Sequence, residues 1–300
     1  MKFNIIFHIT TYCNFDCSYC DVIKDNKKVS LEVRENIIKF IFNNQDYIET
    51  FKFFWWEPLI AFDDIKYIIN NNNLEKKYSL VTNTSLIEDK FWVYLENYFK
   101  ILFFSIDTEN KFYLKKVTDF IKNYNLYDKV YFNLIISPWE ELDAYKNFLN
   151  LYKLWFKKFN ILPVYFTKSW TKLNLKNLTS VMKKILDLTF NDKDLLLYWF
   201  MENDWTKTNL FNNVIFVDID WKIYYSDLAS TYYWKEIKED LFLWNVWDFS
   251  LSSLENHDFK KEENAIKKLE DSIYKKVSWQ KELHKVMDYF SVYLNEKNGK

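Results

Sequence analysis

The sequence predicts an α/β fold in which a parallel sheet curves into an open, partial (β/α)6 barrel and a C-terminal extension follows. Up to about residue 190, short runs rich in β-branched and aromatic residues alternate with amphipathic helical runs. Strict strand–helix alternation indicates a parallel sheet with right-handed crossovers. Six such units are too few to close an eight-unit barrel, so we expect the sheet to stay open.

The expected elements follow one another in a regular order. The strands cover residues 3–9, 50–54, 77–82, 101–106, 129–136 and 161–166. The helices cover residues 30–45, 62–72, 88–98, 110–124, 140–157 and 174–190, and Ser30 is the expected N-cap of the first. Beyond them, residues 213–226 indicate a hairpin, 241–247 an extended piece and 259–297 a charged helical tail. We therefore divide the chain into a core, residues 1–195, and a C-terminal extension, residues 196–300.

Charge and hydropathy exclude some classes of partner. The chain has 41 basic and 42 acidic residues, a net charge of −1, so we expect no nucleic-acid partner. There is no run of 18 apolar residues and no export signal at the N-terminus, so we expect no membrane association. Reduced thiols together with the lack of an export signal predict a cytoplasmic protein.

The three cysteines of the chain, Cys13, Cys17 and Cys20, lie in one C-x3-C-x2-C run after the first apolar segment. Structural zinc sites need four ligands, usually in paired knuckles, and a disulfide would leave one cysteine over. Iron–sulfur clusters normally take four cysteines. Three thiolates therefore leave one metal position open for chemistry. An iron–sulfur cluster is the favoured interpretation, with another metal or a chance grouping as the alternatives.

This triplet, with an aromatic residue before its last cysteine, resembles the cluster loop of the radical S-adenosylmethionine (SAM) enzymes. The resemblance covers about residues 3 to 190 and implies the partial TIM-like barrel of that family. It also implies two cofactors, a 4Fe-4S cluster held by Cys13, Cys17 and Cys20, and SAM bound at the open iron. A ferredoxin- or flavodoxin-like donor would supply the electron that cleaves SAM to a 5′-deoxyadenosyl radical.

Glycine occurs once, at Gly299, where average usage would give about 21 residues, while tryptophan occurs 13 times. Several tryptophans stand where the backbone favours glycine. Trp139 follows Ser-Pro in a predicted turn, Trp155 follows a helical run, and Trp221 lies in a predicted hairpin. Some bacteria decode UGA as glycine and others as tryptophan. Our hypothesis is that many of these tryptophans are glycines written with the wrong code, and the alternative is a truly Trp-rich protein.

With glycine at Trp55 and Trp56, the end of the second strand becomes Gly-Gly-Glu-Pro, similar to the family motif that contacts the SAM amino group. Glu57 would orient the strand end or accept ammonium hydrogen bonds. If residues 55 and 56 are indeed tryptophans, their two indoles would instead occupy the space for the methionine part of SAM. The resemblance also assigns SAM contacts to residues near three other strand ends. These are Tyr19 against the adenine, Asn83 in a Thr-Asn turn, and Ser105 and Asp107 near the ribose or carboxylate.

The hairpin around Trp221 and the segment that contains Trp244 and Trp247 resemble the C-terminal part of peptide-modifying, SPASM-type members. Those members commonly hold auxiliary clusters through further cysteines. This chain has Ser226 near one such position and no cysteine after Cys20, so the resemblance implies a degenerate, cluster-free extension. We expect a peptide or protein side chain as substrate. The alternatives are a small molecule or nucleoside, and a non-catalytic barrel that binds a metal or a partner.

Overall fold

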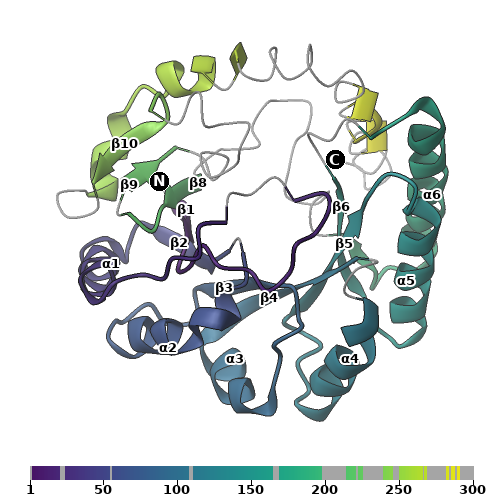
Figure 1. The fold of residues 1–300 in the computed structure, drawn as a ribbon, viewed down its shortest axis with the longest axis horizontal. Helices are drawn as coiled ribbons and strands as arrows, with labels where there is room; N and C mark the ends of the chain where they lie inside the picture. Colours follow the sequence, from purple (N-terminus) through teal and green to yellow (C-terminus); the bar gives the residue numbers. More distant parts are fainter. Residues whose placement is uncertain are drawn as a thin grey trace.

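The structure is a computed structural model, and it describes a set of ranges separated by gaps. These are residues 2–20, 24–54, 56–107, 111–164, 169–197, 214–220, 222–225, 239–245, 250–265, 267–268, 282–283, 285–287 and 289–290. Within them a curved sheet forms an open barrel, and helices α1 to α6 surround its outer side (Figure 1). The predicted partial barrel is confirmed.

The described strands form one sheet of order β10-β9-β8-β1-β2-β3-β4-β5-β6-β7. Strands β1 to β8 pair in parallel, and β9 and β10 add antiparallel neighbours. The strands are β1 (Phe3–Phe7), β2 (Ile48–Phe53), β3 (Tyr78–Thr82), β4 (Phe99–Ile106), β5 (Val130–Ile136), β6 (Lys158–Pro163), β7 (Leu196–Leu197), β8 (Val214–Val217), β9 (Lys222–Tyr224) and β10 (Phe242–Asn245).

The helices connect successive strands, as the alternation predicts. They are α1 (Leu31–Asn44), α2 (Phe62–Asn70), α3 (Trp92–Tyr98), α4 (Leu114–Asn123), α5 (Glu141–Lys153) and α6 (Lys172–Asn191). Ser30 caps α1, its side chain accepting from the N–H of Val33, as predicted. The predicted helical tail lies partly outside the described residues, and its described parts are helical from residue 260 onward. No described helix is both long enough and apolar enough to span a bilayer.

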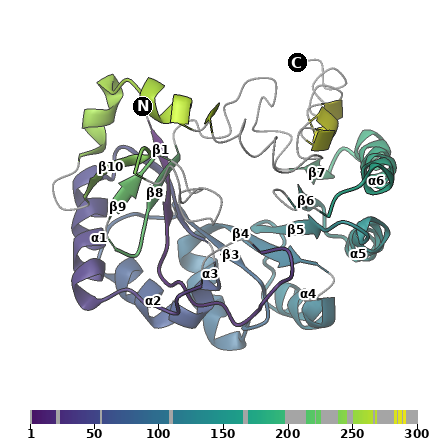
Figure 2. The ribbon, with the colours of Figure 1, turned by 45° about the horizontal axis from the view of Figure 1, so that its top comes forward.

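The C-terminal hairpin joins the sheet of the core. Strand β8 pairs in parallel with β1, and β9 turns back along β8 (Figure 2). A short 3-10 helix, η7 (Leu251–Asn256), then reaches α1, where the buried Asn44 accepts a 2.7 Å hydrogen bond from the N–H of Leu251. The extension therefore covers the β1 edge, while the division at residue 195 stays a prediction.

Ring contacts show which side chains face the helices. Phe148 of α5 packs against Phe159 of β6, with ring centroids 4.8 Å apart. Phe159 contacts Phe132 of β5, and Phe132 contacts Phe104 of β4. Because successive side chains along a strand point to opposite faces, the residues that alternate with these phenylalanines face the inside of the barrel.

The strand register carries this assignment across to β1. Thr82 of β3 pairs with Phe104, Phe53 of β2 pairs with Leu80 of β3, and Phe7 pairs with Phe53. Phe7 therefore faces the helices, and His8, the next residue, faces the inside. His8 is fully buried.

Three tryptophans adopt backbone angles that suit glycine. Trp56 has φ 50°, Trp139 φ 77° and Trp155 φ 72°, all in the left-handed region where a bulky residue is unusual. Trp139 stands third in a turn closed by a 3.1 Å bond from the N–H of Glu140 to the carbonyl of Ser137. With Pro138 second, this is the pattern of a type II turn, whose third position favours glycine.

Trp155 directly follows Leu154, the C-cap of α5. Its N–H donates to the carbonyl of Tyr152 (3.0 Å), and the N–H of Phe156 donates to that of Leu151 (3.2 Å). This bond pair is the Schellman motif, in which the residue at Trp155 is usually glycine. The sequence-based expectation of a glycine-like backbone is thus confirmed at Trp139 and Trp155, while Trp55, Trp221 and Trp247 lie outside the described residues.

Candidate active site

The cysteine loop runs from the end of β1 across the C-terminal edge of the sheet, where the active sites of parallel barrels collect. None of the three described cysteines is in a disulfide; Cys13 and Cys17 are half-buried and Cys20 is exposed. A 3.0 Å bond from the N–H of Cys20 to the carbonyl of Cys17 tightens the second half of the loop. Burial raises the pKa of the Cys13 thiol, and the negative charge of Glu57 adds to this effect.

The donor set on this loop suits an iron–sulfur cluster. Three thiols on one short loop can each bind a different iron of a cubane, which leaves the fourth iron open. The three thiols do not gather around one point as the ligands of a single metal ion would, and no other three His, Cys, Asp or Glu side chains do so within the described part of the chain.

Glu57 is the buried link between the ends of β2 and β3. One carboxylate oxygen accepts from the Thr82 hydroxyl (2.8 Å) and the N–H of Leu59 (3.0 Å), and the other from the N–H of Asn83 (2.7 Å). Its own N–H donates to the carbonyl of Tyr12 in the cysteine loop (3.2 Å). Burial raises the pKa of Glu57 to about 7, although the three hydrogen bonds oppose the rise. These bonds favour the predicted role of orienting the strand end over that of an ammonium acceptor.

Asn83 lies directly against the cysteine loop. Its side-chain nitrogen is 3.8 Å from Cys13 Sγ and 3.0 Å from Asn14 Oδ1. Asn14 in turn donates to the Ser85 hydroxyl (2.8 Å). The structure therefore brings the predicted residues Asn83, Glu57 and Cys13 together. The sequence did not predict that Asn14 and Ser85 contact Asn83. The position of Asn14 between two cysteines could have pointed to it.

Tyr19 and Asp107 also meet, although they are 88 residues apart. The Tyr19 hydroxyl donates to a carboxylate oxygen of Asp107, so the cysteine loop is tied to the end of β4. Burial, followed by the charge of Asp107, raises the pKa of Tyr19 strongly. Ser105 lies two residues earlier on the same inner face, where it accepts from Asn133 of β5 (3.4 Å). The candidate SAM residues of three strand ends thus share one edge of the barrel.

The predicted site residue Trp56 lies next to His8. Its indole lies on the inner side of the sheet, with its ring centroid 4.5 Å from that of His8 in an edge-on contact. The positive φ at Trp56 shows that the backbone here has the form a glycine allows. Trp55, its predicted partner, lies outside the described residues.

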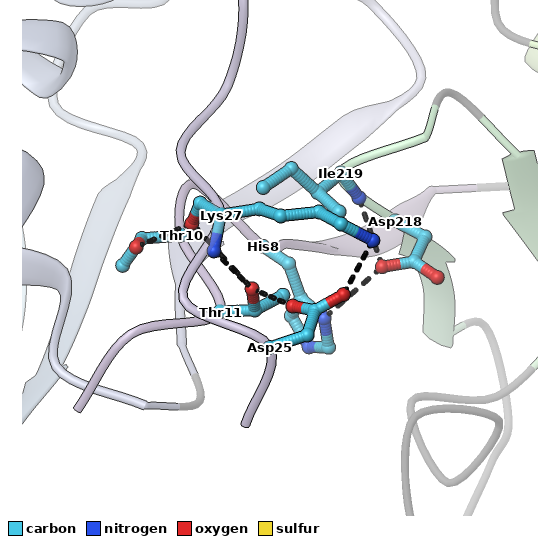
Figure 3. A network of polar contacts seen from close by, with 7 residues as sticks. All are labelled: His8, Thr10, Thr11, Asp25, Lys27, Asp218 and Ile219. Atoms are coloured by element: carbon cyan, nitrogen blue, oxygen red, sulfur yellow. Dashed lines mark hydrogen bonds and ion pairs between the residues drawn. The ribbon is translucent and has the colours of Figure 1, made fainter. Parts of the chain in front are cut away.

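A second polar network joins β1, the end of the cysteine loop and β8 (Figure 3). His8 Nδ1 lies 3.6 Å from a carboxylate oxygen of Asp218, the residue after β8. Nearby, the Thr11 hydroxyl and the Lys27 ammonium both bind Asp25, and the N–H of Lys27 donates to Thr11 (2.9 Å). The pairing of His8 with Asp218 depends on β8 lying beside β1.

Comparison with known proteins supports the family that the motif suggests. The model of the radical SAM superfamily matches residues 7–130. Radical SAM cyclopropyl synthase TigE of Paramaledivibacter caminithermalis is 28% identical over 141 residues, covering 38% of this chain and 29% of TigE. An uncharacterized protein of Methanocaldococcus jannaschii is 31% identical over 93 residues, 29% of this chain and 32% of that protein. The chain thus spans about a third of the length of the curated relatives it matches.

Solved structures share the fold. Native anSMEcpe with bound AdoMet superposes with a TM-score of 0.68 at 16% identity, covering 99% of this chain and 100% of that one. Streptococcus suis SuiB bound to precursor peptide SuiA gives 0.60 at 14% identity, covering 86% and 65%. The matched segment contains the cysteine loop, Glu57, Asn83, Ser105 and Asp107. Residues 7–130 therefore match the radical SAM superfamily, and this match implies a 4Fe-4S cluster and S-adenosylmethionine as cofactors.

Proposed function

We propose that the chain is a radical SAM enzyme that holds one 4Fe-4S cluster through Cys13, Cys17 and Cys20. The observation that carries this proposal is the convergence of the cysteine loop with the ends of β2, β3 and β4, through Glu57, Asn83 and the bond from Tyr19 to Asp107. When bound, the cluster and SAM supply a 5′-deoxyadenosyl radical that abstracts hydrogen from a substrate. The cofactors carry the difficult chemistry, and the protein binds and orients.

The chain's own residues have separate tasks in this proposal. The three thiolates bind iron. Glu57 holds the end of β2 against β3, so that the backbone at residue 56 keeps its place. Tyr19 and Asp107, which bind each other here, are the proposed contacts for the adenine and for the ribose or carboxylate of SAM, with Ser105 below them on the inner face.

Anaerobic reconstitution with iron and sulfide tests the proposal. We expect about four irons per chain, and 5′-deoxyadenosine when SAM and a strong reductant are added. Cys17→Ala should abolish both. A Cys17→Ala protein that still cleaves SAM would show that the cluster assignment is wrong.

We further propose that residues 55 and 56 are glycine in the working protein. Three observations support this: the positive φ at Trp56, the type II turn at Trp139 and the Schellman motif at Trp155. Glycine at residue 56 would remove the indole beside His8 and allow the backbone to approach a ligand closely.

The codons at positions 55, 56, 139, 155, 221, 244 and 247 decide this point. TGA codons would support glycine, and any expressed protein should then carry glycine there. TGG codons would make the tryptophans real. The indole of Trp56 on the inner face would then favour a second candidate function, a non-catalytic barrel that binds a metal or a partner.

A peptide or protein side chain is the proposed substrate. SuiB was solved with its precursor peptide SuiA, and anSMEcpe with the Cp18Cys peptide. The present chain shares their fold and carries a hairpin on the β1 edge. A ferredoxin- or flavodoxin-like donor and a cytoplasmic location complete the proposal. Failure of peptide substrates, with turnover of a small molecule or nucleoside, would overturn the substrate assignment while leaving the cofactor chemistry in place.

A further inference from the structure

The Asn83 side chain is held in one orientation by its neighbours. Its Oδ1 accepts from both the N–H (3.1 Å) and the hydroxyl (2.6 Å) of Ser85. Its backbone N–H is fixed by Glu57. Because two donors from Ser85 define the oxygen side of the amide, the nitrogen must face the opposite way.

The nitrogen side of the Asn83 amide faces Cys13, the first cysteine of the loop. Asn83 Nδ2 lies 3.8 Å from Cys13 Sγ, and its second hydrogen points to Asn14 Oδ1 at 3.0 Å. The Asn14 amide donates back to Ser85. Asn83, Asn14 and Ser85 thus form a closed ring of hydrogen bonds, which keeps an N–H donor aimed at the Cys13 sulfur.

A cation also holds the same loop. Lys24 Nζ donates to the carbonyl of Phe15 (2.6 Å) and to a carboxylate oxygen of Asp16 (2.9 Å), both between Cys13 and Cys17. The Lys24 side chain is 22% exposed, whereas that of Asp16 is fully exposed. Solvent therefore screens the carboxylate more than the ammonium. Burial alone would lower the pKa of Lys24. The hydrogen bond to Asp16 and the charges of Cys20, Asp16 and Cys13 outweigh this effect, so the net pKa is raised and the ammonium stays protonated.

We propose that Asn83 and Lys24 are positioning residues that raise the reduction potential of the cluster bound by Cys13, Cys17 and Cys20. Hydrogen bonds to cysteine sulfur and nearby charge are among the factors that set the potential of such clusters. Both groups offset negative charge on the thiolates, so they favour the form that has gained an electron. This inference rests on the proposed function, and it assigns Asn83 to a thiolate rather than to SAM.

The test is a redox titration of the reconstituted full chain, followed by electron paramagnetic resonance with dithionite as reductant. Asn83→Asp keeps the shape of the side chain but replaces the donor with an acceptor. Lys24→Met removes the charge and Lys24→Arg restores it. Ser85→Ala removes the hydroxyl donor to the Asn83 amide oxygen and leaves the backbone donor in place. Lys146→Met is the matched control, because Lys146 is an exposed lysine paired with Asp143 at 2.8 Å and lies on α5.

We expect every variant to bind about four irons. In Asn83→Asp and Lys24→Met, the ratio of reduced to oxidised cluster at a fixed potential should fall about three- to tenfold, tenfold being 59 mV for one electron. In Ser85→Ala this ratio should fall less. In Lys24→Arg and Lys146→Met it should equal that of the unmodified chain.

Equal midpoint potentials in Asn83→Asp, Lys24→Met and the unmodified chain would overturn the inference and leave the proposed function standing. If the unmodified chain itself binds no iron, the proposed function fails, and the inference fails with it. If Asn83→Asp does not fold, Ser85→Ala and Lys24→Met still decide the question.

Discussion

The clearest quantitative consequence of the structure concerns the proton on Glu57. Its carboxyl group is fully buried, and burial raises the pKa to about 7 from the ordinary 4.5. Each tenfold change in acidity corresponds to about 1.4 kcal/mol, so this difference amounts to about 3 kcal/mol. The folded state binds the proton more tightly than the unfolded state. The stability it gives is therefore fully present below pH 4.5 and is lost as the pH rises through about 7.

Glu57→Gln removes this proton while keeping the size of the side chain. Urea unfolding of the cluster-free protein, measured from pH 4.5 to 8 in reducing buffer, should show a free energy of unfolding that falls by about 3 kcal/mol more in the unmodified chain than in the variant. The comparison cancels the other titrating groups, because both proteins share them. Parallel curves of stability against pH would refute the assignment of a raised pKa to Glu57.

Two further predictions concern buried and paired groups elsewhere. Asn44→Ala should lower the free energy of unfolding by about 1–3 kcal/mol in urea titrations, because it leaves the N–H of Leu251 without its buried acceptor; an unchanged value would contradict the docking of η7 on α1. Hydrogen bonds from Lys157 and Tyr152 lower the pKa of Asp192 to about 2, so its contribution is present above pH 3.8 and lost as the pH falls through 2. Asp192→Asn should therefore unfold with a shallower acid dependence between pH 4 and 2, and an identical acid midpoint would argue against the pair.

The local pattern of the sequence was enough for the barrel but not for the contacts between distant segments. Apolar runs such as residues 129–136 predicted where the strands lie and in which order they follow one another. Ser30 predicted where α1 begins. The last core strand begins at Lys158 rather than 161, because Lys158 and Asn160 are polar residues that face the inside and interrupt the apolar run. Helix α5 ends at Lys153 rather than 157, because the Schellman motif at Trp155 closes it.

The candidate cofactor residues could be predicted from the sequence because they lie in short motifs near strand ends. The contacts that hold them could not, because they join segments far apart in the chain. Asn83 reaches Cys13 across 70 residues, and Tyr19 reaches Asp107 across 88. His8 lies beside Asp218 only because β8 adds to the β1 edge. The spacing of residues along the chain does not predict such contacts between distant segments.

The hypothesis of misread glycines makes a prediction about stability that needs no cofactor. Helices α4 and α5 end in the same Schellman motif. After α4 the left-handed residue is Asn125, with φ 52°, and after α5 it is Trp155, with φ 72°. Asparagine tolerates this conformation, whereas tryptophan pays about 1–2 kcal/mol for it.

Trp155 is 78% exposed, so replacing it loses little packing. Glycine gives back about 0.5–1 kcal/mol through its greater freedom in the unfolded chain. Trp155→Gly should therefore raise the free energy of unfolding by about 0.5–1 kcal/mol, while Asn125→Gly should change it by no more than about 0.5 kcal/mol. Paired urea titrations measure both. A loss of stability in Trp155→Gly larger than that in Asn125→Gly would mean that tryptophan belongs at this helix end, and the case for glycine at residues 55 and 56 would lose its best structural support.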